Sequence, residues 1–214
     1  MEPPPAVWES GPTRLLDYGT TDPAGTDGDP VLFVPSLVNR SYIMDLTAER
    51  SLMRFLAARG FRPLLLDWGT PGPRELAMGF DDCIGATMRE ALAVANERAG
   101  GPVPVVGYCM GGTMATALAC LCPDRIAALA LLAAPWDFHA ATGGPPPMIV
   151  AGRTALEGIL ATMECLPVDA IQALFFSLDP VKGWSKFRAF ARLRPDSPQA
   201  ATFVALEDWL NDGV

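Results

Sequence analysis

A cysteine lies in the middle of a glycine-rich segment, GYCMGG, which directly follows the apolar run VPVV within residues 103–112. The spacing of Gly107, Cys109 and Gly111 is that of a nucleophile elbow, a sharp strand-to-helix turn that exposes a nucleophilic side chain, although serine usually takes the central position. The flanking glycines carry no Cβ that would collide with neighbouring backbone, and Gly112 lets the next helix lie close to the strand. The pattern predicts that Cys109 is a catalytic nucleophile; the alternative is a small buried thiol without a chemical role.

The chemistry that this turn predicts is acyl transfer. The N-terminus of the following helix favours the thiolate form of Cys109 through its dipole. The backbone N–H of Met110 is expected to donate to an oxyanion, and the second donor is expected from the loop PSLVN at residues 35–39, where Val38, or else Leu37, is the candidate. With a thioester substrate, transfer to cysteine exchanges one thioester for another and keeps the acyl group activated. Cysteine therefore fits transfer to a second nucleophile better than simple hydrolysis.

The elements that must hold this turn alternate along the chain. Near-continuous apolar runs predict strands, and amphipathic stretches between them predict helices, which together indicate a mostly parallel sheet covered by helices on both faces. The expected strands lie at residues 30–35, 61–69, 103–106 and 126–135, and the expected helices at 46–60, 80–101 and 111–124. In the first helix we expect Leu52, Phe55 and Leu56 to share one face. Residues 1–29 are rich in Pro, Gly, Asp and Thr, and predict a loose arm.

The pattern changes after Pro135, where strand signals stop. Helical stretches rich in Met, Ala, Leu and Phe follow at residues 148–163, 168–178 and 200–210. We therefore expect a core over residues 1–144 and an inserted helical cap over residues 145–214.

Composition excludes several functional classes. The chain of 214 residues has a formal net charge of −8, which argues against a general nucleic-acid-binding surface. The N-terminus is acidic and proline-rich rather than a signal peptide, and the longest apolar run, Ile126–Trp136, is too short to cross a bilayer. Five cysteines without an export signal indicate reduced thiols and a cytoplasmic protein. Cys120 and Cys122 should point to different faces of a helix, so we expect no metal site.

Four segments resemble the poly(3-hydroxyalkanoate) synthases, and their spacing is closest to the class with a short catalytic subunit. The segments are VPSLVNRSYIMDL (34–46), LLLDWGTPG (64–72), DDCIG (81–85) and GYCMGGT (107–113), with weaker correspondence at 135–143 and 203–213. The resemblance covers the chain from about residue 30 onward. It implies an α/β-hydrolase fold with a cap, and a Cys–His–Asp triad that polymerises (R)-3-hydroxyacyl-CoA and releases CoA.

When the family's roles are carried over by position, the resemblance implies that Cys109 is the nucleophile. It also implies that the N–H groups of Met110 and Val38 donate to the oxyanion. It implies no cofactor, because the CoA thioester is the substrate. The partners that it implies are a growing polyester chain or granule, a second synthase subunit and a homodimer.

The chain departs from the family pattern at the rest of the triad. The family order is nucleophile, acid, histidine, whereas the single histidine, His139, aligns with no catalytic position. We expect His139 to lie beyond hydrogen-bond reach of the Cys109 sulfur, and Asp67 and Asp137 to cap loops. The triad His and Asp are thus expected to be absent, which predicts an N-terminal portion of a longer protein that is nearly inactive alone, with a sheet incomplete at its C-terminal edge.

Other features leave alternatives open. The basic residues between Asp179 and Asp196 fit either the phosphates of CoA or a solvated helix face, and the aromatic residues of the expected cap fit either a partner surface or internal packing. Two rival functions remain. One is a cysteine hydrolase of the dienelactone hydrolase type, which turnover of a lactone rather than an acyl-CoA would identify. The other is a non-catalytic binding protein on polymer granules.

Overall fold

The computed structural model of the protein describes residues 4–21, 28–137, 143–144, 147–163, 167–178 and 180–212. The chain divides into two units, one up to Trp136 and one that begins at Asp137. Each unit has its own architecture. That the second unit acts as a cap, and that this cap begins at residue 145, stay predictions.

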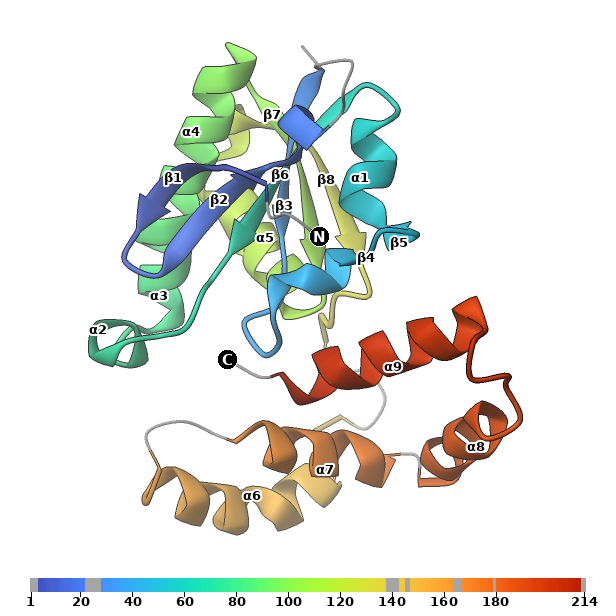
Figure 1. Ribbon diagram of the computed structural model, residues 1–214. Coiled ribbons are helices and arrows are strands. Elements are labelled where there is room, and N and C mark those ends of the chain that lie inside the picture. The colour runs from blue at the N-terminus through green and yellow to red at the C-terminus, as the bar shows by residue number, and fades with distance from the viewer. Residues whose placement is uncertain are drawn as a thin grey trace. The chain divides into compact units, whose positions relative to one another are not determined.

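The first unit is built on a sheet whose described strands follow the order β1-β2-β6-β3-β7-β8 (Figure 1). β6, β3, β7 and β8 run parallel, and β1 and β2 add an antiparallel edge. The bounds are β1 Ala6–Ser10, β2 Thr13–Asp17, β3 Asp29–Val34, β6 Phe61–Asp67, β7 Val103–Tyr108 and β8 Ile126–Leu132. The four predicted strands are confirmed, and so is the mostly parallel α/β fold.

Helices cover both faces of this sheet, as predicted. Along β6 the side chains of Leu64 and Leu66 enter one buried cluster with α4 and α5, while Leu65 enters a second cluster on the opposite face with α1. This alternation is the period of two that a strand imposes. The helices of this unit are α1 Leu52–Ala57, α2 Pro73–Leu76, α3 Phe80–Asp82, α4 Arg89–Ala99 and α5 Met110–Leu121, with 3-10 turns η1 Tyr18–Thr21, η2 Ser41–Met44 and η4 Pro123–Arg125.

The prediction of a loose N-terminal arm was wrong for the hairpin of β1 and β2. Gly11, with φ of 58°, makes the turn between them. β2 pairs with β6 and buries Leu15 and Leu16 on opposite faces of the sheet. The two strands are only five residues long each, so the surrounding Pro, Gly and Thr residues dominated the composition.

The predicted helix over residues 46–60 was too long. Two short strands, β4 Asp45–Thr47 and β5 Arg50–Ser51, precede the helix. The helix begins only after Ser51, whose Oγ accepts a hydrogen bond from the Arg54 N–H at 2.9 Å and thereby caps the N-terminus. Met53 and Ala57 are buried, Leu56 is partly buried against the same cluster as Met53, and Leu52 and Phe55 are exposed.

The predicted helix over residues 80–101 is present but is not a regular α-helix throughout. A π-helical segment, η3 Cys83–Met88, separates α3 from α4. π-helical turns inside α-helices occur frequently at functional sites. Gly100 ends α4 in the left-handed conformation, with φ of 67°, as the glycine pair predicted.

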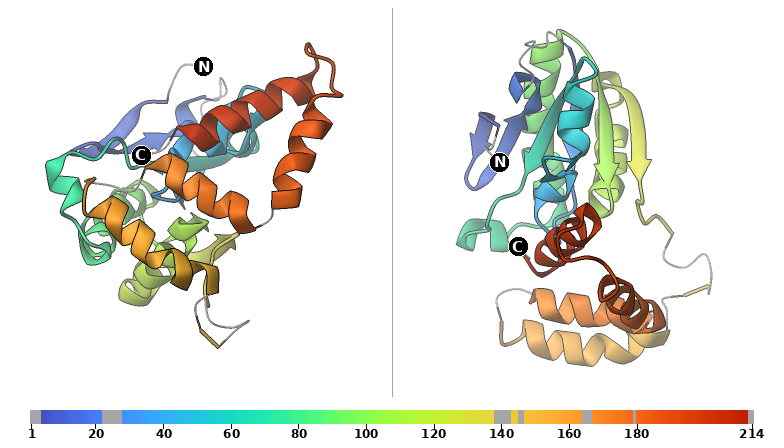
Figure 2. Two further views of the ribbon diagram at one scale, coloured as in Figure 1. Left: turned by 90° about the horizontal axis from the view of Figure 1, so that it is seen from below. Right: turned by 45° about the vertical axis from the view of Figure 1, so that its right-hand side comes forward.

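The second unit is helical throughout its described residues, apart from the connections between helices. It contains α6 Pro147–Leu160, α7 Val168–Leu178, α8 Pro180–Phe190 and α9 Pro198–Asn211 (Figure 2, orange to red). Phe203 of α9 stacks on Phe190 of α8, with ring centroids 4.3 Å apart. Gln172 of α7 donates to the Leu210 carbonyl at 2.7 Å. These contacts join three of the helices.

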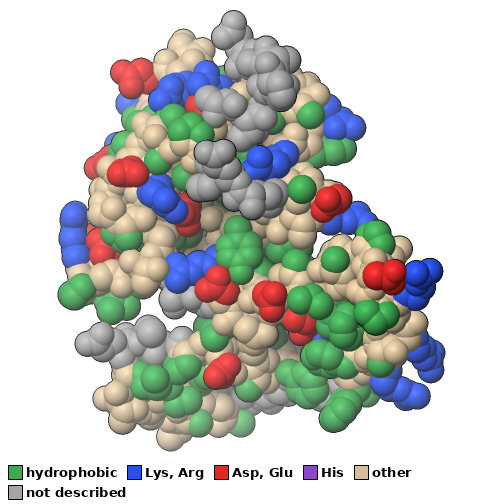
Figure 3. Space-filling view, in the orientation of Figure 1, with side chains coloured by type: hydrophobic (Ala, Val, Ile, Leu, Met, Phe, Trp, Pro, Cys, Tyr) green, Lys and Arg blue, Asp and Glu red, His purple; other side chains and the backbone are tan. Residues whose placement is uncertain are grey.

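Part of the predicted basic stretch is neutralised inside the second unit. Lys186 pairs with Glu207 at 2.7 Å, and Arg194 pairs with Asp196 at 3.0 Å. These ion pairs favour the solvated-face interpretation over phosphate binding. Hydrophobic side chains also reach the surface of this unit (Figure 3), among them Trp184, which is 70% exposed. Internal packing therefore accounts for only some of its aromatic residues.

Candidate functional site

Cys109 occupies a strained turn between β7 and α5. Its backbone has φ of 54° and ψ of −129°, and Ala133 is the only other non-glycine residue with positive φ in the described ranges. The Cys109 N–H donates to the Leu132 carbonyl at 2.9 Å, and the Cys109 carbonyl accepts from the Gly112 N–H at 2.8 Å. Such conformations persist only where surrounding structure enforces them. The predicted strand-to-helix elbow is therefore confirmed as geometry, while the role of Cys109 as nucleophile stays a prediction.

The three glycines of the elbow are required by close backbone approaches. A Cβ on Gly107 would collide with the backbone of Gly112, and a Cβ on Gly111 would collide with the carbonyl oxygens of Val34 and Pro35. A Cβ on Gly112 would lie 2.5 Å from the Cβ of Ala134. The N-terminus of α5 consequently lies directly against the ends of β3 and β7, as the sequence predicted.

The sulfur of Cys109 is half-buried and makes no hydrogen bond within the part of the chain that the structure describes. It stands at the N-terminus of a 12-residue helix, where the helix dipole favours an anion. The preceding residue, Tyr108, was not singled out from the sequence. Burial, and next the adjacent Cys109, raise the pKa of Tyr108, so its phenol stays protonated beside the turn. Burial, and then Asp82, raise the pKa of the Cys83 thiol.

The N–H groups of the candidate oxyanion donors differ in whether they already make a hydrogen bond. Met110 is the first residue of α5, a position whose N–H has no partner inside the helix. The Val38 N–H donates to the Ser36 hydroxyl oxygen at 3.1 Å. The Leu37 N–H makes no hydrogen bond to any described residue. Of the two candidates on this loop, only the Leu37 N–H is therefore without a hydrogen bond to a described residue, and the role of either N–H as an oxyanion donor stays a prediction.

Asp67 ties together the two loops at the carboxyl ends of β3 and β6. Its Oδ1 accepts from the Ser41 hydroxyl at 3.0 Å and from the Gly69 N–H at 3.3 Å, and its Oδ2 accepts from Arg14 at 2.7 Å. Arg40 donates to the Gly69 carbonyl at 2.8 Å. This geometry agrees with the interpretation of Asp67 as a loop-capping carboxylate.

Trp68 makes a further link that the sequence did not reveal. Its indole Nε1–H donates to the Pro35 carbonyl at 3.2 Å, and its own carbonyl accepts from the Thr13 hydroxyl at 3.3 Å. Pro35 directly precedes the loop with the candidate oxyanion donors. Trp68 therefore positions that loop against β6 and β2.

A second buried network holds the segment after this loop. The Tyr18 hydroxyl donates to Asp45 at 3.1 Å, and Arg54 donates to both oxygens of the same carboxylate at 2.9 and 3.0 Å. Burial, followed by the charge of Asp45, raises the pKa of Tyr18 well above its ordinary value. This network anchors η2 and β4 against the sheet.

Several predicted positions are not tested by this geometry. His139 lies outside the described residues, and the role of Asp137 stays a prediction. Cys120 is exposed and Cys122 is buried, so they point to different sides as expected. Among the described residues, no three His, Cys, Asp or Glu side chains gather as metal ligands would, and none of the helices has the length and apolar character needed to span a membrane.

Comparison with known proteins gives one family and a set of relatives. The model of the alpha/beta hydrolase fold family matches residues 29–205. The poly(3-hydroxyalkanoate) polymerase subunit PhaC of Haloarcula marismortui is 30% identical over 99% of this chain and 46% of its own length. The corresponding subunit of Haloferax mediterranei is 31% identical over 99% of this chain and 43% of its own. The resemblance predicted from the sequence is confirmed, and the chain spans about half the length of these curated relatives.

Solved structures agree on the fold. The thioesterase domain from the curacin biosynthetic pathway superposes with a TM-score of 0.50 at 19% identity, covering 81% of this chain and 60% of that one. At this identity the likeness concerns the fold alone.

Proposed function

Because this chain belongs to the α/β-hydrolase fold family and its curated relatives are poly(3-hydroxyalkanoate) polymerase subunits, we propose that it carries the acyl-accepting site of a polyhydroxyalkanoate synthase. The observation that carries the proposal is the positive φ of Cys109 at the N-terminus of α5. In this proposal the turn directs the Cys109 sulfur and the Met110 N–H toward the same substrate carbonyl. The proposed substrate is an (R)-3-hydroxyacyl-CoA.

In the first step the Cys109 thiolate attacks the thioester carbonyl carbon. The carbonyl oxygen becomes an oxyanion, which the N–H groups of Met110 and of Leu37 or Val38 stabilise; one such donor contributes roughly 10²–10³-fold in rate. The bond from the carbonyl carbon to the CoA sulfur then breaks. CoA leaves as a thiolate and takes up the proton that Cys109 gave up, and the acyl group remains on Cys109 as a thioester.

In the second step the hydroxyl of another 3-hydroxyacyl unit attacks this thioester. A carbon–oxygen ester bond forms, the bond to the Cys109 sulfur breaks, and the hydroxyl proton returns to that sulfur. The chain of esters is thereby one unit longer, with no change in oxidation state.

We further propose that this chain turns over slowly when it is alone. No described residue donates to or accepts from the Cys109 sulfur, so none of them is placed as the general base that would contribute roughly 10²–10⁴-fold. Its proposed partners in the cell are the growing polyester, a second synthase subunit and, in the cytoplasm, the polymer granule. The two archaeal relatives are named as polymerase subunits, which supports the second of these partners.

The test supplies (R)-3-hydroxybutyryl-CoA to the chain and follows free CoA thiol, together with the mass of the peptide that contains Cys109. We expect an acyl adduct on Cys109, its loss in Cys109→Ala, and slower formation in Cys109→Ser, because a hydroxyl is the poorer nucleophile. Cys120→Ala, at an exposed cysteine, is the matched control and should behave as the unaltered chain. Equal CoA release by Cys109→Ala would overturn the proposal. Turnover of lactones alone would favour the cysteine hydrolase.

A further inference from the structure

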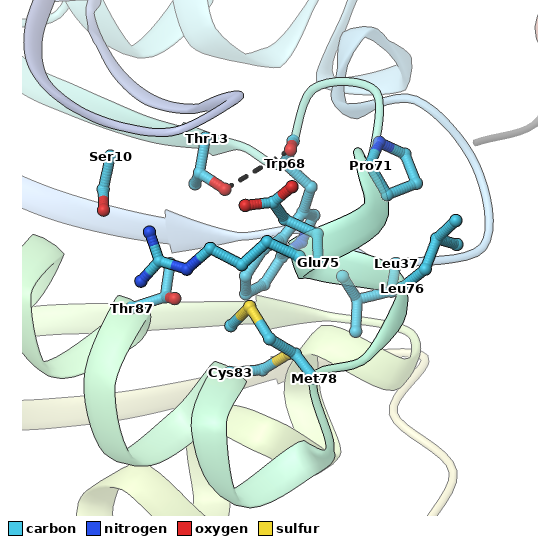
Figure 4. A pocket seen from close by; sticks show the side chains of 11 residues that line it. Ser10, Thr13, Leu37, Trp68, Pro71, Glu75, Leu76, Met78, Cys83 and Thr87 are labelled. Carbon is cyan, nitrogen blue, oxygen red and sulfur yellow. Dashed lines mark hydrogen bonds between the residues drawn. The ribbon is translucent and has the colours of Figure 1, made fainter.

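A cavity of about 290 Å³ lies within the first unit, beside the loop with the candidate oxyanion donors (Figure 4). Leu37, which follows β3, and Trp68, which follows β6, both line it. It therefore opens at the carboxyl ends of two neighbouring parallel strands, where α/β proteins commonly bind ligands. Its volume is close to the lower end of the range for small-molecule sites. None of its residues forms or breaks bonds in the proposed reaction.

The two ends of this cavity differ in chemistry. Ser10 and Thr87 lie at one end in Figure 4, whereas Leu37, Pro71 and Leu76 lie at the other. A ligand that fits both ends must be amphipathic, with a short polar head and an apolar tail.

The polar end offers hydrogen-bond donors that are not in use. Arg74 lines this cavity together with Ser10 and Thr87, and the same three residues line a second hollow that adjoins it. Their side chains make no hydrogen bond or ion pair with any residue that the structure describes. By contrast, the Thr13 hydroxyl is committed to the Trp68 carbonyl. The free donors favour a head group that accepts hydrogen bonds, such as a carbonyl.

The charges around the polar end argue for an uncharged head. Glu75 lines the cavity, and its Oε2 accepts from the Gly72 N–H at 3.0 Å. Asp82 and Glu90 line the adjoining hollow with Arg74. Three carboxylates thus surround one guanidinium, so a carboxylate head would meet net repulsion. An ester carbonyl accepts the same hydrogen bonds without carrying charge.

We propose that this cavity binds an ester unit of a hydroxyacyl chain, with the carbonyl at Arg74, Ser10 and Thr87 and the alkyl part at Leu37, Pro71 and Leu76. That the ester belongs to the growing polyester rests on the proposed function. Because Leu37 is common to the cavity and to the oxyanion loop, an occupied cavity keeps the product chain next to the acylation turn.

The experiment measures binding to the Cys109→Ala chain, in which acyl transfer cannot intervene. By calorimetry we titrate the methyl ester of the 3-hydroxybutyrate dimer, the free acid of the same dimer, and pantetheine. We expect the ester to bind and the free acid to bind at least tenfold more weakly. Arg74→Gln should weaken ester binding several-fold, and Leu76→Trp, which fills the apolar end, should abolish it with an unchanged circular dichroism spectrum. Arg98→Gln, at an exposed arginine of α4, is the matched control.

Three outcomes would overturn this proposal: equal affinity for ester and acid, ester binding that Arg74→Gln and Leu76→Trp leave unchanged, or binding of pantetheine without binding of the ester. The acyl adduct on Cys109 is measured separately on the unaltered chain. Failure of ester binding with a normal adduct would therefore reject the cavity alone, whereas absence of the adduct would reject the proposed function.

Discussion

Replacement of Gly111 by alanine adds one carbon atom, Cβ, at the contact between α5 and the end of β3. The new Cβ would collide with two backbone carbonyl oxygens, those of Val34 and Pro35, and neither can rotate aside as a side chain does. Overpacking of this kind costs about 3 kcal/mol at its upper end, and alanine in a helix gains about 1 kcal/mol over glycine, so the expected net loss of unfolding free energy is about 2 kcal/mol. Acylation of Cys109 should fall about tenfold or more, because the displaced strand end leads directly into the oxyanion loop.

The matched control is Gly85→Ala in the same unit. Gly85 lies in the π-helical segment, and a Cβ there would meet nothing within 4 Å. It should leave the unfolding free energy unchanged or raise it by up to about 1 kcal/mol. Urea unfolding followed by tryptophan fluorescence gives the stabilities, and the mass of the Cys109 peptide gives the acylation rates. If Gly111→Ala matches Gly85→Ala in both measurements, the close approach of α5 to β3 is not what the elbow requires.

Three further variants test the networks around the oxyanion loop. Asp67→Asn should lower the free energy of unfolding by about 1–3 kcal/mol in urea titrations, because it weakens the acceptor that holds Ser41. It should also slow acylation of Cys109. An unchanged acylation rate would show that Asp67 does not position the loop with the candidate oxyanion donors. Asp45→Asn should lower the free energy of unfolding by about 1.5–3 kcal/mol, because its charge-assisted hydrogen bonds to Arg54 are lost. Neutralising an exposed ion pair of α6 should lower the free energy of unfolding by less than about 0.5 kcal/mol. Equal effects of the two changes would refute this ranking. Because its pKa is raised, Tyr18 keeps a proton in the folded state that the unfolded state loses, so the free energy of unfolding should fall as pH rises above about 10, by at most about 1.4 kcal/mol per pH unit. Tyr18→Phe should remove this part of the pH dependence. An identical pH profile in the variant would contradict the raised pKa of Tyr18.

Local sequence was sufficient to predict structure where a segment's own residues determine its conformation. The parallel strands are continuous apolar runs, and the glycines around Cys109 specify the elbow because each is required by backbone only a few residues away or by the end of the adjacent strand. The N-terminal hairpin was missed because β1 and β2 are short, and β2 is held in the sheet by its second pairing with β6, about fifty residues further along the chain.

The loop with the candidate oxyanion donors is likewise held by contacts between segments that lie far apart in the sequence. The bond from Trp68 to the Pro35 carbonyl joins positions 33 residues apart, and no local pattern around either residue marks it. The length of α1 was mistaken because β4 and β5 pair with each other before the Ser51 cap begins the helix. The cavity was not foreseen at all, because its lining comes from the hairpin, two loops, α2 and the π-helical segment together.

The π-helical segment Cys83–Met88 gives the long helical region two angular phases. A π turn contains more residues than an α turn, so an inserted residue rotates whatever precedes it around the axis by about 100° relative to an unbroken α-helix. Beyond the segment, Leu92 and Ala95 remain aimed at the sheet, while within it Cys83 and Thr87 are aimed at the cavity. Deleting one residue here would restore a regular α-helix without moving the core face of α4, and the segment's own lining residues, Cys83 and Thr87, would swing away from the cavity. The length of this one segment thus sets which of its side chains line the cavity.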